Sequence, residues 1–494
     1  MLKTALPEEV GIRSSDVYEM LSSLVKRDIH MHSLLLMRGD QVFLDCYWAP
    51  FHKDRTHRMY SATKSYVSVA IGLAEEDGLI DLDAPIASYF PEKIQEPLYP
   101  WLKDQTVREM LTMTTVRGKG NWFLEKPFDR TQFYFARGGT RPAGTLWEYD
   151  SDGSQVLCAL VEKVTGKKLL EYLNERIFCH LGAFQNARIL STANGDSWGD
   201  SALICTPRDM ATFARFVMNY GTWEGKRLMN EAYLRKATSR VVDNRLDGHG
   251  GTLRHGYGYQ FWRTEDDGFA FVGMGDQMAI CMPKQDLIMV CTADNQGYPS
   301  ARDYICSLFL DQIAYKASDK PLPENKKEEA RLRSLADSLT LHAAKGAPDS
   351  PWREKLHGVR YVCGENPMTW KEFSFTFEGA ASGTLRFVNA RGEMILPFDI
   401  NANRFGKFPE EGYSREVGAV RTTDGHRYDD AVSGAWLQDN KLMLFVQILD
   451  DYYGNLSLLF AFKDDMAALR AVRTAEDFLW DYEGSLVAER VLLS

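Results

Sequence analysis

The sequence has no uninterrupted apolar run that approaches the ~18–20 residues of a membrane-spanning helix. Its first residues, Met-Leu-Lys-Thr-Ala-Leu-Pro-Glu-Glu, also lack the apolar stretch of a secretory signal. Basic residues are in deficit, because 58 Lys and Arg against 68 Asp and Glu leave a net charge of −10. These features predict a cytoplasmic protein and argue against a nucleic acid or a membrane as the main partner.

Several motifs that carry chemistry are also missing. The eight cysteines form no C-x-x-C pair, so we expect them to be reduced and to act as small core residues. The ten histidines show no H-E-x-x-H or other metal spacing. Neither a nucleotide-binding G-x-x-x-x-G-K-[ST] nor the G-x-S-x-G elbow of α/β-hydrolases is present. We therefore expect no metal and no organic cofactor.

The chain has 494 residues, 45% of them hydrophobic, which is enough for two or more domains with ordinary cores. Residues 317–328 are polar and carry prolines, as expected for a linker. Beyond about 350, short alternating runs between turns are typical of a small antiparallel barrel or sandwich. The sequence thus predicts a first domain over 1–320, a linker or helix over 321–345, and a β-rich accessory domain over 346–494.

The first domain shows strands at both of its ends and helices between them. This order predicts an α+β fold with one antiparallel sheet, flanking helices and a helical lobe. The expected strands lie within 33–48, as a hairpin that turns at 38–41, and at 255–263, 269–273, 277–283 and 287–293. The expected helices cover 66–78, 106–115, 154–165, 207–220 and 302–316.

Ser61-Ala62-Thr63-Lys64 places a hydroxyl and an amine three residues apart at the start of a predicted helix. Positions i and i+3 share a helix face, so Lys64 would lie against the Ser61 oxygen, near the positive end of the helix. The pair would suit a serine nucleophile activated by a lysine. The same spacing occurs at Ser23 and Lys26, and a serine at a helix start also serves simply as an N-cap. The neighbouring sequence must decide.

Two later segments offer what a serine–lysine centre needs. Tyr149 follows a proline–glycine turn and could move protons if a cation stabilised its phenolate. Residues 271–277, Phe-Val-Gly-Met-Gly-Asp-Gln, form a strand that enters a glycine-rich turn, where a free N–H could face an oxyanion.

In combination these segments resemble the serine hydrolases related to class C β-lactamases, D-alanyl-D-alanine carboxypeptidases and penicillin-binding esterases. The S-x-x-K motif of that family matches 61–64, its Tyr-x-Asn element falls on 149–151, and its Lys- or His-x-Gly element falls on 271–273. The similarity runs over roughly residues 5–315. Further stretches common in such proteins are 109–114, 206–211 and 221–226.

The resemblance implies a β-lactamase/transpeptidase-like fold and hydrolysis through an acyl-enzyme. Ser61 would be the nucleophile, and Lys64 and Tyr149 would share the general base and acid work. The oxyanion hole would be the backbone N–H groups of Ser61 and Met274. A lysine that is partly desolvated beside another proton carrier loses its own proton more readily, which agrees with this assignment.

The site departs from the family pattern at two positions. Ser151 replaces the asparagine that contacts a substrate amide, and Phe271 replaces the cation that helps to hold a carboxylate. Both changes, with Trp147 nearby, favour an uncharged ester or amide. Gly273 opens a turn similar to the G-x-x-G-Q of relatives that hydrolyse aminohexanoate oligomers, and His255 is a further candidate for the cleft.

The expected partner is therefore a small-molecule ester, amide or β-lactam-like compound, small peptides and D-amino acid amides included. Two alternatives remain open at this point. One is a non-catalytic penicillin-binding or sensor-type protein on the same fold. The other is a true β-lactamase or D-peptidase, which would need a cationic carboxylate anchor such as Arg254 or Arg263.

Overall fold

The computed structural model of the chain describes residues 2–116, 122–246, 251–422 and 424–491. Two compact units make it up: unit 1 comprises Met1–Thr340 with Glu416–Gly418, and unit 2 comprises Leu341–Arg415 with Ala419–Ser494. Among the described residues, no helix has both the length and the apolar character needed to cross a membrane.

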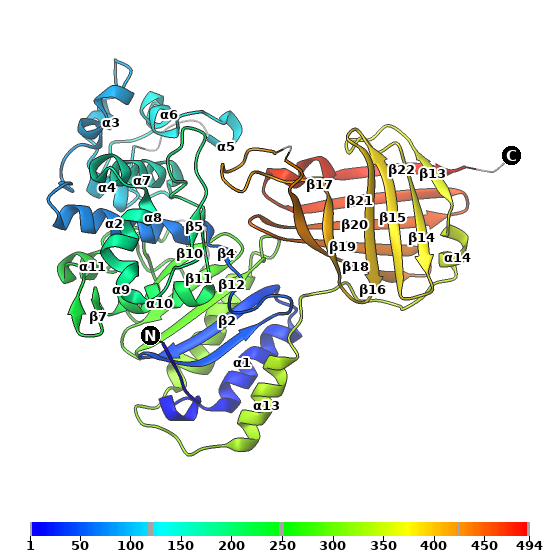
Figure 1. Cartoon of the computed structure of the whole chain (residues 1–494), viewed down its shortest axis with the longest axis horizontal. Helices are drawn as coiled ribbons and strands as arrows, with labels where there is room; N and C mark the ends of the chain where they lie inside the picture. The colour runs from blue at the N-terminus through cyan, green and yellow to red at the C-terminus, as the bar shows by residue number, and fades with distance from the viewer. Residues whose placement is uncertain (1, 117–121, 247–250, 423, 492–494) are drawn as a thin grey trace. The chain divides into compact units, whose positions relative to one another are not determined.

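Unit 1 is built on a sheet whose first strands come from the N-terminus and whose last come from residues 262–293 (Figure 1). Its neighbours pair antiparallel, except that the short edge strand β1 runs parallel to β3. In spatial order the strands are β1 (Lys3–Thr4), β3 (Gln41–Tyr47), β2 (Met31–Arg38), β12 (Leu287–Ala293), β11 (Gln277–Met282), β10 (Phe269–Gly273) and β9 (Trp262–Arg263).

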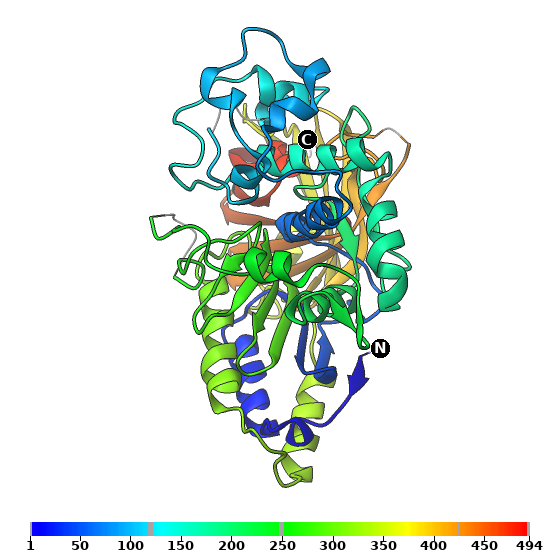
Figure 2. The same ribbon diagram turned by 90° about the vertical axis from the view of Figure 1, so that its left-hand side faces the viewer.

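Helices cover both sides of this sheet (Figure 2). Every residue of β11 and β12 is buried, which requires an apolar neighbour on each face. Longer helices of the unit are α1 (Ser14–Lys26), α2 (Thr63–Glu76), α7 (Ser151–Thr165), α10 (Pro207–Met218), α12 (Ala301–Leu308) and α13 (Lys326–Asp337). Shorter helices are α3 (Pro100–Lys103), α4 (Val107–Leu111), α5 (Trp122–Glu125), α6 (Arg130–Ala136), α8 (Leu169–Leu173), α9 (Cys179–Leu181) and α11 (Glu231–Ala237).

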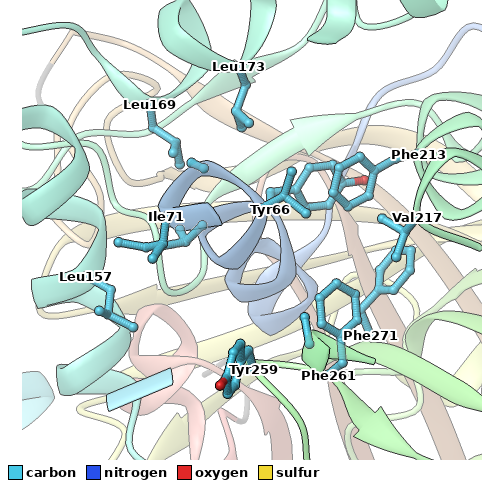
Figure 3. Packing of buried hydrophobic residues seen from close by; sticks show 14 of the residues in the cluster. Tyr66, Ile71, Leu157, Leu169, Leu173, Phe213, Val217, Tyr259, Phe261 and Phe271 are labelled. Atoms are coloured by element: carbon cyan, nitrogen blue, oxygen red, sulfur yellow. The ribbon is translucent and has the colours of Figure 1, made fainter. Parts of the chain in front are cut away.

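Helix α2 runs through the centre of the core. Its residues from Thr63 to Ala74 are all buried, because it packs against α7, α8 and α11 and also reaches β10. Tyr66 and Ile71 point from α2 into the cluster drawn in Figure 3. The helix ends before Gly78, whose φ of +71° favours a residue without a Cβ. The site at the start of α2 therefore stands on a rigid, buried element.

The hairpin predicted within 33–48 is confirmed, with Arg38 opposite Gln41. One predicted strand is wrong in extent, because the segment 255–263 is extended only over β9, Trp262–Arg263. Gly256 has a φ of +112° and Gln260 a φ of +62°, and both values break a strand.

Unit 2 is a β-barrel. Alternate residues of its strands are buried, as in β14 and β15, and aromatic side chains such as Phe375 fill the interior. A parallel pairing of β16 with β18 closes the ring, and β17 extends from β18. In pairing order the strands are β16 (Gly392–Ile400), β15 (Ser382–Asn389), β14 (Glu372–Glu378), β13 (Arg360–Cys363), β22 (Gly484–Arg490), β21 (Met466–Ala475), β20 (Tyr453–Lys463), β19 (Lys441–Leu449), β18 (Arg427–Gln438) and β17 (Arg404–Glu411).

The observed architecture confirms the predicted α+β class: a sheet with flanking helices and a helical lobe in unit 1, and a barrel at the C-terminal end.

Candidate active site

Ser61 lies in a one-turn 3₁₀ helix, Tyr60–Ala62, that continues directly into α2. Tyr60 has a φ of +47°, an unusual value for a residue with a bulky side chain. The Thr63 hydroxyl donates to the Tyr60 carbonyl at 2.6 Å and closes this turn. Backbone strain of this kind persists only where the surrounding structure holds it, and here it orients the residue that carries the candidate nucleophile.

The Lys64 amine lies 2.9 Å from the Ser61 hydroxyl oxygen and donates to the Asp200 carbonyl at 2.6 Å. Lys64 is only 2% exposed, so its amine is almost completely removed from water. The second S-x-x-K spacing behaves differently: Ser23 and Lys26 lie in the last turn of α1, and Lys26 is exposed. Only the first copy brings its amine and hydroxyl together in a buried place.

Tyr149 lies just before α7, where the Asp150 carboxylate caps the helix by accepting from the Gly153 N–H at 3.1 Å. The Lys64 amine lies 5.1 Å from the centroid of the Tyr149 ring. The other predicted partner of Ser61 is therefore close to the same amine. Ser61 and Tyr149 thus both lie near the Lys64 amine.

Aromatic rings surround Tyr149. Its own ring stacks on Trp262, with centroids 5.6 Å apart and an interplanar angle of 18°. Trp147 packs against both Tyr257 and Trp262, at 5.4 and 5.6 Å. Burial raises the pKa of the Tyr257 phenol, and the neighbouring Tyr149 adds to that increase. Tyr257 therefore stays neutral here.

Trp147 also lines a hollow of about 840 Å³ on the surface of unit 1. One wall is the 144–148 segment and the other is 242–246. Leu146 and Leu246 are exposed in it, while Glu148 pairs with Arg141 and Asp243 pairs with Arg245. The lining is thus mixed, with its charges already paired.

The predicted glycine-rich turn lies beside the start of α2. A Cβ on Gly273 would lie 2.2 Å from the Met59 carbonyl oxygen and 3.1 Å from the Tyr60 side chain. Glycine is therefore required for the end of β10 to approach the turn that carries Ser61. Met274, whose N–H is the predicted oxyanion donor, follows immediately, and its side chain is 38% exposed.

Gln277 holds this turn from the inside. Its fully buried side-chain amide donates to the carbonyls of Met274 and Ala293, at 2.8 and 2.7 Å, and accepts from the Ala293 N–H at 3.0 Å. Next to it, the buried Asp276 pairs with Arg302 at 3.0 Å. Burial raises the pKa of the Asp276 carboxyl, and the nearby Arg302 guanidinium opposes that increase.

Phe271 corrects one expectation. Its side chain is fully buried and lies in the hydrophobic core against Tyr66, Phe213 and Phe261 (Figure 3). The prediction that Phe271 contacts substrate is therefore wrong. The motif placed the residue on the correct strand, but a large apolar side chain gains far more by packing into the core than by facing the cleft.

The remaining predicted residues lie in different surroundings. Ser151 is half-buried in the first turn of α7. His255 is exposed and lies 4.0 Å from Glu265, and no described contact joins it to Ser61 or Lys64. Arg254 is exposed. Arg263 is buried and donates to the Thr238 carbonyl, which turns its charge away from a role as carboxylate anchor.

The sequence did not predict the roles of three residues of the site. Asp200 accepts from Lys64, Gln277 holds the Met274 turn, and Trp262 stacks on Tyr149. Asp200 and Trp262 act across more than a hundred positions of the chain, so no local pattern marks them. Gln277 was visible as the last letter of the G-x-x-G-Q resemblance, but nothing in the sequence showed that its amide faces inward.

Comparison with known proteins identifies the family and the fold. The family model described as Beta-lactamase matches residues 20–305. The 6-aminohexanoate-dimer hydrolase of Paenarthrobacter ureafaciens is 24% identical over 312 residues, which cover 58% of this chain and 79% of that protein. A solved structure from Bacillus anthracis, provisionally named a 6-aminohexanoate-dimer hydrolase, has a TM-score of 0.51 at 20% identity and covers 62% of this chain and 83% of its own.

A provisionally named beta-lactamase from Bacteroides dorei DSM 17855 has a TM-score of 0.50 at 14% identity, covering 60% of this chain and 99% of that one. At identities of 20% and 14%, these two structural similarities show the fold alone. The family model spans more than half of the chain and includes all the segments that surround Ser61. The chain belongs to the Beta-lactamase family and is a serine hydrolase of that fold.

Proposed function

We propose that Ser61, Lys64 and Tyr149 form the catalytic centre of an acyl-transfer hydrolase. The observation that carries this proposal is the buried amine of Lys64, 2.9 Å from the Ser61 oxygen and 5.1 Å from the Tyr149 ring. An amine held out of water beside a hydroxyl is suited to accept its proton. All residues of the centre belong to unit 1, so we assign the chemistry to the predicted domain of residues 1–320.

In the first half-reaction, the Lys64 amine accepts the proton of the Ser61 hydroxyl while the oxygen attacks the substrate carbonyl. A bond forms between Ser61 Oγ and the carbonyl carbon, and the carbonyl oxygen takes up the negative charge. The proton then passes through Lys64 or Tyr149 to the leaving nitrogen or oxygen. The carbon–nitrogen or carbon–oxygen bond breaks and the acyl-enzyme remains.

The backbone N–H groups of Ser61 and Met274 would stabilise the negative oxygen. The close approach of Gly273 to Met59 supports this assignment, since it brings the Met274 turn to the residues that precede Ser61. Donors fixed in advance, as Gln277 fixes this turn, need no reorganisation when charge develops. In the second half-reaction water attacks the acyl carbon, gives its proton to Lys64 or Tyr149, and releases the acid and Ser61.

For the substrate we propose a small linear amide or ester without a recognised carboxylate at the scissile end. Two observations support this class. Arg263 donates to the Thr238 carbonyl, and the buried Phe271 stands where relatives carry a cation, so neither position supplies a carboxylate anchor. The hollow beside Trp147 combines exposed leucines with charges that are already paired. The name of the relative from Paenarthrobacter ureafaciens makes 6-aminohexanoate dimer the first amide to test.

The test is a panel of substrates with matched variants: 6-aminohexanoate dimer, p-nitrophenyl butyrate, a D-alanine anilide, D-alanyl-D-alanine and the β-lactam nitrocefin. We expect turnover of 6-aminohexanoate dimer, p-nitrophenyl butyrate or the D-alanine anilide, reduced by about 10³-fold or more in Ser61→Ala. Ser23→Ala, which removes the serine of the second S-x-x-K, should retain full activity. Activity that survives Ser61→Ala would contradict the proposal. Turnover of D-alanyl-D-alanine or nitrocefin alone would favour the peptidase or β-lactamase alternative.

A further inference from the structure

Lys64 depends on a residue far along the chain. The Asp200 carbonyl accepts from its amine at 2.6 Å, while the Asp200 carboxylate lies 2.9 Å from the Arg130 guanidinium. Both of these side chains are almost completely buried, with 3% and 5% exposed. One residue thus touches the amine through its backbone and an arginine through its side chain.

The segment that carries Asp200 is held on several sides. Arg58 donates to the Ser201 carbonyl at 3.0 Å. The Gln155 amide donates to the Ser197 carbonyl at 2.9 Å and accepts from the Gly199 N–H at 3.0 Å. A Cβ on Gly199 would lie 2.4 Å from Cys158, so the backbone is packed directly on α7. The Asp200 carbonyl consequently has a fixed position.

Arg130 has its own buried surroundings. Its guanidinium stacks on Trp122 at 3.6 Å and lies 5.9 Å from the ring of Trp198. Asp152 lies 3.9 Å from Arg130 and pairs with Arg137 at 2.6 Å. Burial raises the pKa of Asp152, and the Arg137 charge opposes that increase.

A buried ion pair is costly to desolvate and is often no more stabilising than apolar residues of the same volume. Stability alone therefore gives little reason for the pair of Arg130 and Asp200. Its place, one backbone carbonyl away from the Lys64 amine, gives a functional reason.

We propose that Arg130 and Asp200 are positioning residues of the serine–lysine centre. Asp200 orients the Lys64 amine through its carbonyl, and Arg130 neutralises the Asp200 carboxylate so that this charge does not hold the proton on Lys64. The inference rests on the proposed function, because it assigns a task to residues that act through Lys64. Neither residue contacts the Ser61 hydroxyl in any described interaction.

The charges around the amine fix the sign of the expected effects. The Ser61 hydroxyl, the Tyr149 ring and the Asp200 carbonyl lie near the amine. Beyond them, Arg130 pairs with the Asp200 carboxylate, Asp152 pairs with Arg137, and Arg58 donates to the Ser201 carbonyl. Arg130→Met leaves a bare carboxylate near the amine, which favours protonated Lys64 and raises the pH needed for activity. Asp200→Asn leaves a bare guanidinium, which favours neutral Lys64 and lowers that pH.

The experiment measures the rate at which a fluorophosphonate probe labels the full-length protein from pH 5 to 10. The acid limb is the part of the profile in which the rate falls as the pH is lowered. It should move up by about one pH unit in Arg130→Met and down by about one in Asp200→Asn. The double variant should return towards the wild-type position, and Arg130→Lys, which keeps the charge, should restore most of the profile. Arg391→Met, which breaks the ion pair with Glu410 in unit 2, is the matched control and should leave the limb in place.

A purely structural role predicts another pattern, in which both single variants lower the rate at every pH and the limb stays where it is. That result, with wild-type protein labelled normally, would overturn the inference and leave the proposed function standing. Failure of the probe to label wild-type protein would overturn the proposed function and this inference together. Thermal unfolding of each variant identifies any that fails to fold. If one single variant fails, the other still carries the test, because Arg130→Met and Asp200→Asn are expected to move the limb in opposite directions.

Discussion

The ring of Tyr149 stacks on Trp262, an edge-strand residue more than a hundred positions away, with an interplanar angle of 18°. Trp262 is 4% exposed and also contacts Trp147 and Tyr257. The stack leaves Tyr149 little freedom to rotate. The aromatic cluster therefore fixes the direction in which the Tyr149 hydroxyl points relative to Lys64.

Replacement of Trp262 tests this relationship. Trp262→Ala removes the ring on which Tyr149 stacks, and the loss of one aromatic pair corresponds to about 0.5–1.5 kcal/mol, or up to about tenfold in rate. We expect the reduction in kcat, with KM little changed. Trp262→Phe keeps a ring in place and should retain most of the activity. Equal activity in the alanine and phenylalanine variants would show that the stack does not orient Tyr149.

The oxyanion assignment concerns a backbone group, so it predicts an unusual pair of results at Met274. Met274→Ala keeps the N–H and should change the labelling rate by less than about twofold, since the Met274 side chain is exposed. Met274→Pro removes the N–H and should reduce the rate by about 10²–10³-fold. Circular dichroism shows whether the proline variant folds. A folded proline variant with normal labelling would place the oxyanion donor elsewhere.

The close approach of Gly273 to Met59 predicts that a larger residue at position 273 would clash. In Gly273→Ala the new methyl group would lie 2.2 Å from the Met59 carbonyl oxygen, so strand β10 and the Ser61 turn must move apart. We expect a loss of about 1–3 kcal/mol in unfolding free energy and a strong loss of activity. Gly138→Ala is the matched control, because its nearest neighbour would be 3.9 Å away. Urea unfolding and ester hydrolysis measure both effects; unchanged activity in Gly273→Ala contradicts the close approach.

A buried pair of histidines, His32 in β2 and His57 shortly before Ser61, predicts how stability responds to acid. The His57 Nδ1 lies 2.9 Å from the Arg58 carbonyl, which can only accept, so the His57 Nε2 is the acceptor for the His32 Nδ1–H at 2.8 Å. Burial lowers the pKa of His57 to about 3 and lowers that of His32 as well. Neither ring carries a charge at neutral pH.

The direction in which stability changes with pH follows from the number of protons bound to the folded and unfolded chains. Between about pH 3 and the unfolded value of about 6.5 the unfolded chain binds more protons at His57 than the folded protein does. Stability is therefore complete above pH 6.5 and falls as the pH is lowered, by about 2 kcal/mol at pH 5 from His57 alone. Urea unfolding at pH 7.5, 6 and 5 measures the slope, and His57→Gln should flatten it. The same slope in wild type and variant would assign the acid sensitivity to other groups.

The sequence predicted the parts of the site that depend on short-range geometry. Ser61 and Lys64 are three residues apart on one helical turn, and the Gly273 turn follows a strand with an obvious apolar pattern. It failed where the fold brings distant segments together: nothing local showed that Asp200 would accept from Lys64 or that Trp262 would carry Tyr149. The prediction that Phe271 contacts substrate failed, because a motif identifies the strand but not the face on which a large apolar side chain packs.

The fold, like the site, was predicted correctly where local pattern decides the structure and wrongly where it does not. The hairpin of β2 and β3 and the alternating strands of the barrel follow from local pattern and turn chemistry. The predicted strand over 255–263 forms only at Trp262–Arg263, because Gly256 and Gln260 adopt positive φ values that no local pattern indicated.

The most direct test of the central claim is the intact mass of the protein after incubation with a fluorophosphonate. We predict one adduct per chain, located on Ser61 by peptide mapping, absent in Ser61→Ala and present in Ser23→Ala. Lys64→Met should slow adduct formation by about 10²-fold or more, since the base is removed. An adduct that persists in Ser61→Ala, or no adduct on the folded wild-type protein, would contradict the account.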